Sequence, residues 1–543
     1  MTLPTESYAT VHQAFVETAG KQPDKAWLAV PALAGRDYHP DGFEMTYGEG
    51  LAGIEALREI YAAAGFGLGH RVALMLDNRP DHFLHLWALN GLGVSVVPVN
   101  GDYLEHELAY LLEHSDCDLA LGLAKYAERL RAAAASRSRS LPVLFLEDWP
   151  QDLPAPERAA AAGAPRRDSE AAVIYTSGTT GRPKGCLLDN DYFFAVGIWY
   201  AQLGGRLTLQ PGRERLFVPL PVFHVNAGVN TPTALILTAN CLILPDRFHP
   251  KTWWRDLVAT KATGCHYLGV VPPILLKAPP SPEERAHSVA FGLGAGLDPR
   301  LHRAFEERFG IPMVEVWGMT ETGRFLADAY EPRRIETRAF GRPTETFLAK
   351  VADDEGREVP RGTPGELLVR WAGDNPRKGF FTGYLKDPEA TEAAWKGGWF
   401  HSGDLVVQDD DGMLIFVERK KNVIRRSGEN ISAAEVENGL IGAPQVAQVA
   451  VMAVEDPLRD EEVMAIVVAA EGHAPDRATA EAIFTYAGDW LSYHKLPGWI
   501  LFLESLPTTG TQKIAKHQIF GAEVEPTEGA FDLRDRKKRK TAA

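Results

Sequence analysis

Residues 175–185 read YTSGTTGRPKG, and the short apolar run 171–174 leads into them. That run is typical of a buried strand, so the motif is expected in the loop that follows the strand. Its glycines let backbone N–H groups approach a ligand, its hydroxyl groups donate hydrogen bonds, and Lys184 supplies positive charge, which together suit a polyphosphate. It is not a Walker A loop, because no Gly-Lys-Ser/Thr follows Gly181 and Pro183 interrupts the stretch. Taken alone, the stretch is equally compatible with a polar surface turn.

The composition is that of a soluble globular protein. The 543 residues exceed one compact core, so at least two domains are expected, with ordinary apolar (45%) and charged (24%) contents. A net charge of −15 argues against nucleic acid or an anionic membrane as the main partner. Four cysteines without C-x-x-C spacing favour a reducing cytoplasm over a disulfide framework. We expect a cytoplasmic protein without a signal peptide or a membrane span.

Strand and helix patterns alternate on both sides of the loop and predict an α/β fold. Before it, strands are expected at 43–47, 71–76 and 94–99, and helices at 50–64, 80–90 and 105–112. After it, strands are expected at 216–220, 242–244, 266–271 and 313–317, and shorter antiparallel strands at 341–369 and 413–417. This alternation indicates doubly wound, mainly parallel sheets that bind ligands at the carboxyl ends of their strands. Residues 131–140 and 151–170 are predicted to be surface connections because they lack an apolar pattern.

The pattern changes after Arg419, where a smaller α+β domain is predicted. Its expected helices are 435–442 and 478–491, and its expected strands are 446–454, 463–470 and 499–503. The predicted organisation is a large N-terminal domain over 1–419, a C-terminal domain over 420–525 and a tail over 526–543. The tail contains RDRKKRK at 534–540 and is expected to be disordered, as blocks of like charge usually are.

The 175–185 motif resembles the signature phosphate loop of the adenylate-forming superfamily, which includes acyl-CoA synthetases, aryl-CoA ligases, peptide-synthetase adenylation domains and luciferases. Further family motifs follow in order between residues 45 and 520. The resemblance implies that the loop holds the β- and γ-phosphates of ATP and that Thr179 helps to bind Mg²⁺. The residues assigned to this contact are Thr176, Ser177, Gly178, Thr179, Thr180, Gly181 and Lys184.

Residues 316–322, VWGMTET, are similar to the family segment that contacts the nucleotide. The resemblance implies that Trp317 stacks on adenine, Thr320 contacts the α-phosphate and Glu321 helps to hold Mg²⁺, which prefers hard oxygen ligands. Tryptophan replaces the usual tyrosine and keeps a stacking face. Outside this context, the Thr-Glu pair would be a helix cap.

Two segments between these motifs resemble the adenine loop and the border of the acyl pocket. Gly294, Ala295 and Gly296 match the adenine loop, although the family often has proline where Gly296 stands. His224 in PVFHVNA (221–227) matches the residue that borders the acyl pocket, and its alternative is a hydrogen-bonded structural histidine. Apolar side chains at Val225, Val270 and Leu293, with Gly292, are expected to line that pocket.

The C-terminal motifs carry the remaining assignments. Asp404 in GWFHSGD (398–404) resembles the aspartate that accepts hydrogen bonds from ribose, and Arg419 the arginine that reaches ribose and phosphate. Lys421 takes the hinge position and Gly428 the position that lines the pantetheine tunnel, with Ser427 replacing a frequent glycine. In PTTGTQKIAK (507–516), Lys513 matches the family's catalytic lysine, and Lys516 is its nearest competitor.

The resemblance implies a two-step reaction with ATP, Mg²⁺ and CoA. A carboxylate attacks the α-phosphorus of ATP and expels pyrophosphate, and the small domain then rotates about Lys421 so that a thiol can accept the acyl group. Charge stabilisation is the main need of the first step, and Lys184, Glu321 and Lys513 are expected to supply it. Transfer of the acyl group to CoA gives acyl-CoA and AMP, and the enzyme could form a homodimer.

Several alternatives stay open. An acyl-carrier-protein ligase is the nearest one, because the basic tail could dock an acidic carrier. Luciferase-type oxidation and a non-catalytic nucleotide-binding protein are further alternatives, whereas amino-acid activation is disfavoured because 223–226 (FHVN) contains no aspartate. Residues 457–461 (PLRDE) and 427–430 (SGEN) resemble crotonobetaine/carnitine-type ligases. This weaker resemblance favours a short or medium acid, and medium-chain fatty and aryl acids remain open.

Overall fold

The computed structural model describes most of the chain and divides it into two compact units. The described residues are 7–150, 152–176, 183–426, 429–457, 459–491, 493–508, 514–521 and 524–537. Unit 1 comprises Met1–Ala349, Val369–Phe400 and Asp411–Ile415, and unit 2 comprises Lys350–Leu368, His401–Asp410 and Phe416–Ala543. The predicted pivot at Lys421 stays a prediction.

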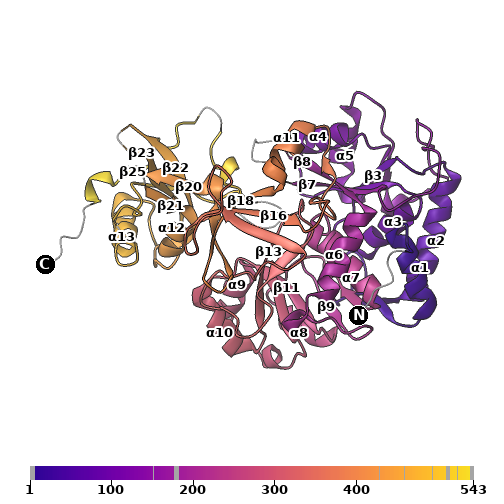
Figure 1. The fold of residues 1–543 in the computed structure, drawn as a ribbon, viewed down its shortest axis with the longest axis horizontal. Helices are drawn as coiled ribbons and strands as arrows, with labels where there is room; N and C mark the ends of the chain where they lie inside the picture. Colours follow the sequence, from indigo (N-terminus) through magenta and orange to yellow (C-terminus); the bar gives the residue numbers. More distant parts are fainter. Residues whose placement is uncertain are drawn as a thin grey trace. The chain divides into compact units, whose positions relative to one another are not determined.

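A seven-stranded sheet carries the phosphate-loop motif in unit 1 (Figure 1). Its order is β17-β8-β7-β4-β3-β5-β6, with parallel pairing from β7 to β6 and antiparallel pairing of β7 with β8 and of β8 with β17. The strands are β3 (Arg71–Met75), β4 (Ser95–Pro98), β5 (Leu119–Gly122), β6 (Val143–Phe145), β7 (Glu170–Thr176), β8 (Lys184–Asp189) and β17 (Gly383–Tyr384). The helices α2 (Tyr47–Ala63), α3 (Pro80–Gly91), α4 (Glu105–Ser115) and α5 (Ala127–Ala135) lie between these strands in sequence.

An eight-stranded sheet in unit 1 has the order β14-β13-β12-β11-β9-β10-β1-β2. Its inner strands are parallel, while β2 and β14 pair antiparallel at the two edges. The strands are β1 (Ala26–Val30), β2 (Phe43–Thr46), β9 (Arg215–Phe217), β10 (Cys241–Ile243), β11 (Gly264–Leu268), β12 (Phe291–Ala295), β13 (Met313–Gly318) and β14 (Phe325–Ala327). The helices α1 (Val11–Lys21), α6 (Asn190–Gln202), α7 (Thr231–Thr238), α8 (Trp253–Ala259), α9 (Val271–Lys277) and α10 (Pro299–Phe309) belong to the same unit.

A four-stranded sheet has the order β15-β16-β18-β19. The boundary between the two units crosses each of its strands, so every strand has residues in both units. The strands are β15 (Phe347–Ala352), β16 (Gly365–Trp371), β18 (Phe400–Gln408) and β19 (Leu414–Arg419), and α11 (Pro388–Ala394) lies between β17 and β18 in sequence.

Unit 2 also contains a sheet of the order β21-β20-β23-β24-β25, with β22 paired to β23. The strands are β20 (Val423–Arg426), β21 (Glu429–Ser432), β22 (Val446–Asp456), β23 (Asp460–Ala469), β24 (Trp499–Phe502) and β25 (Phe531–Asp532). The helices α12 (Ala433–Leu440) and α13 (Arg477–Ala487) bury Val436, Leu440 and Ile483 in a core shared with β22, β23 and β24.

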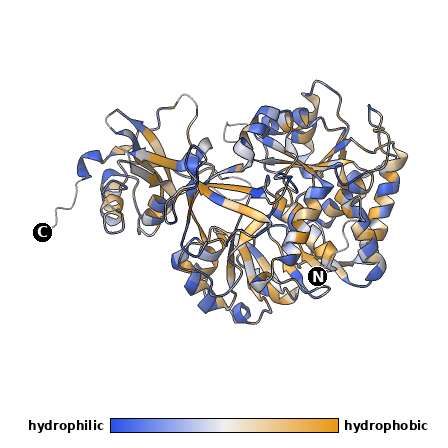
Figure 2. Ribbon diagram, in the orientation of Figure 1, coloured by the Kyte–Doolittle hydropathy of each residue, from blue (hydrophilic) through white to orange (hydrophobic). Residues whose placement is uncertain are grey.

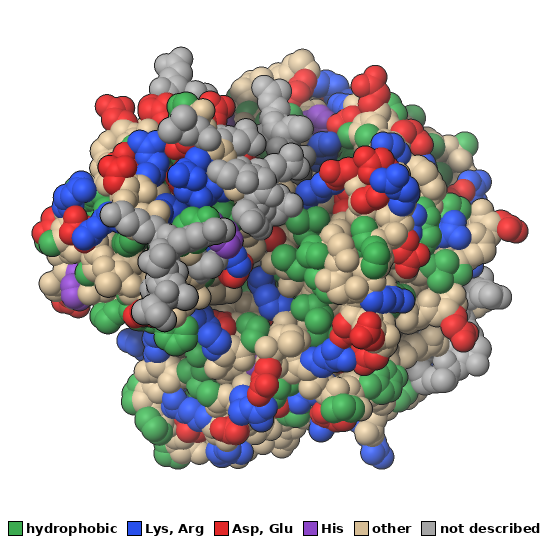
Figure 3. Space-filling model, turned by 60° about the vertical axis from the view of Figure 1, so that its left-hand side comes forward, with side chains coloured by type: hydrophobic (Ala, Val, Ile, Leu, Met, Phe, Trp, Pro, Cys, Tyr) green, Lys and Arg blue, Asp and Glu red, His purple; other side chains and the backbone are tan. Residues whose placement is uncertain are grey.

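Hydropathy follows this architecture. The inner strands are predominantly apolar, whereas the helices show both apolar and polar faces (Figure 2). On the face drawn in Figure 3, basic and acidic side chains are interspersed, as is typical of a solvated surface. None of the helices in the described ranges combines the length and the apolar character needed to cross a bilayer. The predicted fold class, α/β sheets with a smaller α+β C-terminal domain, is confirmed.

Three local predictions are wrong. Part of the predicted connection 131–140 is helix α5, because Leu130, Ala133 and Ala134 bury together despite the arginines beside them. The predicted strand 266–271 ends at Leu268, and α9 begins at Val271. Residues 526–537 of the predicted disordered tail are ordered and include β25. The other residues of the predicted disordered tail, 538–543, lie outside the described part.

Opposite charges explain the ordered tail. Arg534 lies 2.9 Å from an oxygen of Asp456, and Lys537 lies 2.5 Å from an oxygen of Glu462. Leu533 is buried in the same core as α12 and α13. Arg534 and Lys537 of the basic run are therefore neutralised by carboxylates of β22 and β23, which the local sequence does not reveal.

Candidate functional site

The site in unit 1 is built at one edge of the eight-stranded sheet. The parallel strands β9, β11, β12 and β13 are consecutive neighbours, so their carboxyl ends meet at the same edge. The last residues of these strands and the segments that follow them contain the predicted site residues His224, Gly294, Ala295, Gly296, Trp317, Thr320 and Glu321. Sequence-predicted residues that are up to 97 positions apart are thus placed at one edge by strand order.

Glu315 forms hydrogen bonds to the backbone of the predicted adenine loop. Its carboxylate accepts hydrogen bonds from the backbone N–H groups of Gly296, at 2.9 Å, and Leu297, at 3.1 Å. The Tyr267 hydroxyl donates to the same carboxylate at 2.5 Å. Burial raises the pKa of Glu315. Sequence reasoning missed this residue, although a lone acid inside the apolar strand pattern 313–317 is a usable signal.

Glycine is required at two places in this edge. Gly296 has φ +86°, a backbone conformation that L side chains rarely adopt. A Cβ on Gly294 would lie 2.3 Å from the Tyr267 carbonyl oxygen, so β11 and β12 could not keep their spacing. Both glycines therefore follow from backbone geometry, and their contact with adenine stays a prediction.

The aromatic and threonine assignments lie on and after β13. The Trp317 ring is largely buried, with its centroid 6.0 Å from that of Phe340. The Tyr192 hydroxyl of α6 donates to the Thr320 carbonyl at 2.6 Å, which fixes the backbone just before Glu321. Thr320 lies in the segment that follows β13, and the resemblance implies that its hydroxyl contacts the α-phosphate there.

Tyr384 joins the two predicted charged groups of the site. Its hydroxyl donates to Glu321 Oε1 at 2.8 Å, and Lys184 Nζ lies 4.9 Å from the centre of its ring. Lys184 Nζ also lies 3.7 Å from Asp387 Oδ2. Burial and the Glu321 carboxylate raise the pKa of Tyr384 well above its usual value. Sequence reasoning missed Tyr384, whose signal is the Gly-Tyr pair that opens 383–391.

Strand pairing places these groups. β8 begins at Lys184 and pairs with both β7 and β17, so Thr176 lies opposite Lys184 and Cys186 lies opposite Tyr384. The Phe381 N–H donates to the Glu321 carbonyl at 2.9 Å, which ties the segment before β17 to the end of the other sheet. Two of the predicted phosphate contacts, Thr176 and Lys184, and one of the two predicted metal ligands, Glu321, are therefore brought together in unit 1.

Glu321 fits a role in binding Mg²⁺. It is a buried carboxylate held by a neutral donor, and Mg²⁺ on a nucleotide uses one or two protein carboxylates with phosphate oxygens and water. In the described residues, no group of three or more His, Cys, Asp or Glu side chains is arranged to hold a metal ion. Thr179, the other predicted ligand, lies outside the described residues.

His224 begins the segment that leads into the π-helix Asn226–Asn230. The Gly228 N–H donates to the His224 carbonyl at 2.8 Å, and the imidazole centroid lies 4.6 Å from that of Phe223. π-Helical turns are rare and frequently occur at functional sites. The expected border of the acyl pocket therefore has an unusual backbone, while the role of His224 itself stays a prediction.

In unit 2 the two predicted ribose ligands form an ion pair. Arg419 Nε lies 2.7 Å from Asp404 Oδ1, with the aspartate buried and the arginine half-exposed. Ser402 lies two residues before Asp404 on β18, and its hydroxyl donates to the Leu367 carbonyl at 2.7 Å. The serine that replaces the family's usual threonine thus uses its hydroxyl in the fold.

Glu418 connects the predicted hinge to helix α12. Its carboxylate accepts from the N–H groups of Arg419, at 2.7 Å, and Ala434, at 2.6 Å, and from the Ser432 hydroxyl at 3.1 Å. Sequence reasoning placed the hinge at Lys421 and missed this carboxylate, because two of its partners, Ser432 and Ala434, lie more than ten residues further along the chain.

A family model of AMP-binding enzymes matches residues 15–385, and a model of the AMP-binding enzyme C-terminal domain matches residues 435–513. The chain belongs to the AMP-binding enzyme family. The predicted membership is thereby confirmed.

Relatives of this AMP-binding enzyme include named CoA ligases. Sulfoacetate–CoA ligase of Cupriavidus necator is 31% identical over 520 residues, which cover 94% of this chain and 97% of that protein. Crotonobetaine/carnitine–CoA ligase of Proteus mirabilis is 27% identical and covers 88% of this chain and 93% of its own. The weaker resemblance to crotonobetaine/carnitine ligases is also confirmed.

Solved structures share the fold of this AMP-binding enzyme. ATP-bound MatB from Rhodopseudomonas palustris aligns with a TM-score of 0.76 at 23% identity, over 94% of this chain and 98% of that one. o-Succinylbenzoate CoA synthetase from Bacillus subtilis, in complex with an acyl-adenylate intermediate, aligns with a TM-score of 0.78 at 23% identity over the same shares.

Part of the predicted site of this AMP-binding enzyme lies outside the described residues. This part consists of Ser177, Gly178, Thr179, Thr180, Gly181, Gly428, Lys513 and the side chain of Lys421. Their assigned roles stay predictions.

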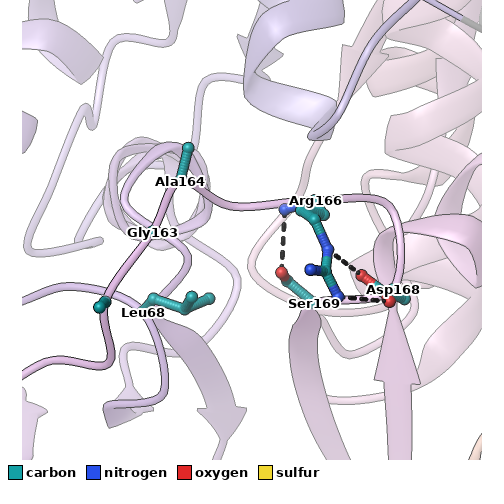
Figure 4. Close-up of a pocket in the computed structure, with 7 residues that line it drawn as sticks. Leu68, Gly163, Ala164, Arg166, Asp168 and Ser169 are labelled. Carbon is teal, nitrogen blue, oxygen red and sulfur yellow. Dashed lines mark hydrogen bonds and ion pairs between the residues drawn. The ribbon is translucent and has the colours of Figure 1, made fainter.

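A separate hollow of about 370 Å³ lies in unit 1 (Figure 4). It is lined by Leu68, Ala162, Gly163, Ala164, Arg166, Asp168 and Ser169. There Arg166 pairs with Asp168 at 2.8 Å and donates its backbone N–H to the Ser169 hydroxyl. Its charged groups are already paired, so it adds nothing to the site.

Proposed function

We propose that this AMP-binding enzyme is an ATP-dependent acid–CoA ligase that forms an acyl-adenylate and then an acyl-CoA. The observation that carries the proposal is the link from Lys184 through Tyr384 to Glu321 at the carboxyl edge of the sheet. Lys184 and Glu321 both contact Tyr384, and Lys184 belongs to the motif that is expected to hold phosphates. CoA ligases among the relatives support the same activity.

The first step joins the acid to AMP. One carboxylate oxygen attacks the α-phosphorus of ATP, and the bond from that phosphorus to the bridging oxygen breaks, so that pyrophosphate leaves with its electron pair. Lys184 and the loop amides would hold the β- and γ-phosphates, and Lys513 would offset charge on the α-phosphate and the incoming carboxylate. Bound Mg²⁺, held by Glu321 and Thr179, would neutralise phosphate charge.

The second step transfers the acyl group to a thiol. The CoA sulfur, as thiolate, attacks the acyl carbon, and AMP leaves with the oxygen that joined it to that carbon. We propose that residues 420–525 move about Lys421 between the steps, relative to an adenylation domain over 1–419. Glu418 would be central to this motion because its carboxylate bonds on both sides of the pivot, to Arg419 and to Ala434.

An acyl-carrier-protein ligase is the alternative that an observation addresses. The basic tail suggested it, but Arg534 and Lys537 are paired with Asp456 and Glu462 in unit 2. These two cations are therefore engaged, which favours CoA as the acceptor. The buried thiols of the four free cysteines agree with a reducing cytoplasm.

Pyrophosphate release tests the proposal. The enzyme with ATP and Mg²⁺ is given aliphatic, aromatic and betaine acids, with CoA, with holo-carrier protein, or with neither. We expect acid-dependent release of pyrophosphate and a thioester with CoA. Thioester formation with the carrier alone would favour the alternative, and no release with any acid would contradict the ligase activity.

A further inference from the structure

A buried hydrogen-bonded chain ends at Asn226, beside the segment expected to border the acid. The Tyr200 hydroxyl of α6 lies 2.8 Å from His266 Nε2, and His266 Nδ1 lies 2.8 Å from Asn226 Oδ1. The Thr231 hydroxyl donates to the same amide oxygen at 3.3 Å. Tyr200, His266 and Thr231 are all essentially inaccessible to solvent, whereas Asn226 is half-buried.

The chain has a definite direction of donation. Burial lowers the pKa of His266 to about 3, so the imidazole is neutral and carries one N–H. Asn226 Oδ1 can only accept, so that N–H is on Nδ1, and Nε2 accepts from the tyrosine hydroxyl. The amide oxygen then receives two donors, which fill its two lone pairs.

The amide nitrogen is left as the outward-facing end. Within the described part of the chain no group accepts a hydrogen bond from Asn226 Nδ2, and this atom is not among the buried polar atoms without a partner. Asn226 Nδ2 is therefore accessible, and its N–H groups are available to a further acceptor. Asn226 follows β9, whose neighbour β11 carries His266, so the amide lies at the edge where the strands end.

The N–H groups of Asn226 need a hydrogen-bond acceptor, so the part of the acid that lies beside them is expected to carry one. We propose that Asn226 hydrogen-bonds an acceptor group at the end of the acid remote from the reacting carboxylate. The substrate class is then a short acid with a distal sulfonate or carboxylate. This inference rests on the proposed ligase function. Tyr200 and His266 fill the space beneath Asn226, so the acid ends at this level.

The same geometry disfavours other acids. A hydrocarbon end or a trimethylammonium end offers no acceptor, so it would bury the amide N–H groups without partners. Sites built to hydrogen-bond a substrate discriminate strongly against analogues that lack the partner. Tyr200 and His266 act as positioning residues, because they hold the amide oxygen inward and the nitrogen outward.

Acids of the form X–CH₂–COO⁻ provide a matched test. Sulfoacetate, 3,3-dimethylbutanoate and trimethylglycine carry tetrahedral ends of similar shape that are anionic, apolar and cationic, and malonate adds a carboxylate end. Pyrophosphate release by the full-length enzyme gives kcat/KM for each. We expect sulfoacetate or malonate to exceed 3,3-dimethylbutanoate and trimethylglycine by about 10-fold or more. The better of the two anions identifies the distal group.

Two variants test the role of the amide. Asn226→Leu should cut the ratio of the preferred anion to 3,3-dimethylbutanoate by about 10- to 100-fold, and Tyr200→Phe should cut it less. Asn375→Leu, in an exposed loop, is the matched control and should leave the ratio unchanged. Both acids are measured on the same preparation, so partial misfolding does not change the ratio.

An unchanged ratio in Asn226→Leu, or a wild-type preference for the apolar or cationic end, would overturn the inference. So would pyrophosphate release with other acids and none with these four. No release with any acid would instead overturn the ligase function on which the inference rests.

Discussion

Arg419 Nε lies 2.7 Å from Oδ1 of Asp404, and both residues were assigned to the ribose from the sequence. Asp404 is 1% exposed and Arg419 is 45% exposed, so the carboxylate is fixed by the fold and the guanidinium group reaches outward from it. The pair orients the arginine before any nucleotide binds. A ribose would therefore meet a prearranged acceptor and donor.

Replacing Asp404 should weaken nucleotide binding. We expect Asp404→Asn to lower kcat/KM for ATP by about 10- to 100-fold, because hydrogen bonds to charged groups contribute about 1.5–3 kcal/mol. Pyrophosphate release at varied ATP concentration measures the effect. The control is Asp410→Asn, which changes an exposed aspartate near the end of the same strand and should behave as wild type. An unaltered ATP dependence in Asp404→Asn would contradict the ribose assignment.

Removing the Tyr384 hydroxyl should disturb Glu321 and leave the fold intact. Tyr384→Phe keeps the ring beside Lys184 and loses the hydrogen bond of 2.8 Å to the Glu321 carboxylate. We expect a higher Mg²⁺ concentration for half-maximal activity and a roughly 10-fold lower rate of adenylation.

The measurement is a Mg²⁺ titration of pyrophosphate release. Tyr330→Phe removes a hydroxyl from a tyrosine that is 62% exposed and serves as the control. A Tyr384→Phe enzyme with the Mg²⁺ dependence of wild type would show that the hydrogen bond does not position Glu321 for the metal.

Lys513 should act in only one of the two steps. We expect Lys513→Ala to reduce adenylate formation by about 100-fold or more, as removal of a preorganised charge does, and to spare thioester formation from supplied acyl-adenylate. Separate assays of the two half-reactions provide the readout.

Lys516→Ala is the comparison variant. Lys516 Nζ lies 2.7 Å from Glu437 Oε1 and donates to the Val451 carbonyl at 2.8 Å, so its role is structural. It should change stability more than it changes the ratio of the half-reactions. Equal losses of both half-reactions in Lys513→Ala would refute the proposed division of roles.

Unit 2 should become more stable at alkaline pH because of Lys537. Burial lowers the pKa of this amine to about 8 from an ordinary value of 10.5, despite the nearby Glu462 carboxylate. Between these two pH values the unfolded chain binds a proton that the native state has lost, so the free energy of unfolding rises with pH. The expected contribution is about 1–3 kcal/mol.

Urea unfolding of the wild type and of Lys537→Met at about pH 7.5 and about pH 9.5 isolates this contribution from other titrating groups. The rise in unfolding free energy between the two pH values should be smaller in Lys537→Met by that amount. Lys251→Met, at an exposed position, should match wild type. The same pH dependence in all three proteins would show that Lys537 is not a buried cation.

The sequence alone identified the chemistry because the nucleotide motifs are local. A phosphate loop, a threonine-glutamate pair and the order of the short motifs along the chain can be recognised without knowledge of their neighbours in space. The alternation of strands and helices was also readable, since hydrophobic periodicity is set by residues a few positions apart. Between 43 and 503, most of the predicted strands coincide with observed strands to within a few residues, whereas β5, β6, β8, β12, β14, β17, β18, β20 and β21 were not predicted.

Only the tertiary structure decided which groups touch. Tyr384 reaches Glu321 because β17 joins the edge of one sheet beside the end of another, and Asn226 faces outward because His266 on a neighbouring strand holds its oxygen. Lys537 is buried because Glu462, 75 residues away, supplies the opposite charge. Hydrogen bonds and ion pairs depend on distance in space, and strand order brings together side chains whose local patterns carry no sign of one another. The phosphate-loop motif indicated the class of reaction, whereas tertiary packing determined which side chains contact each other.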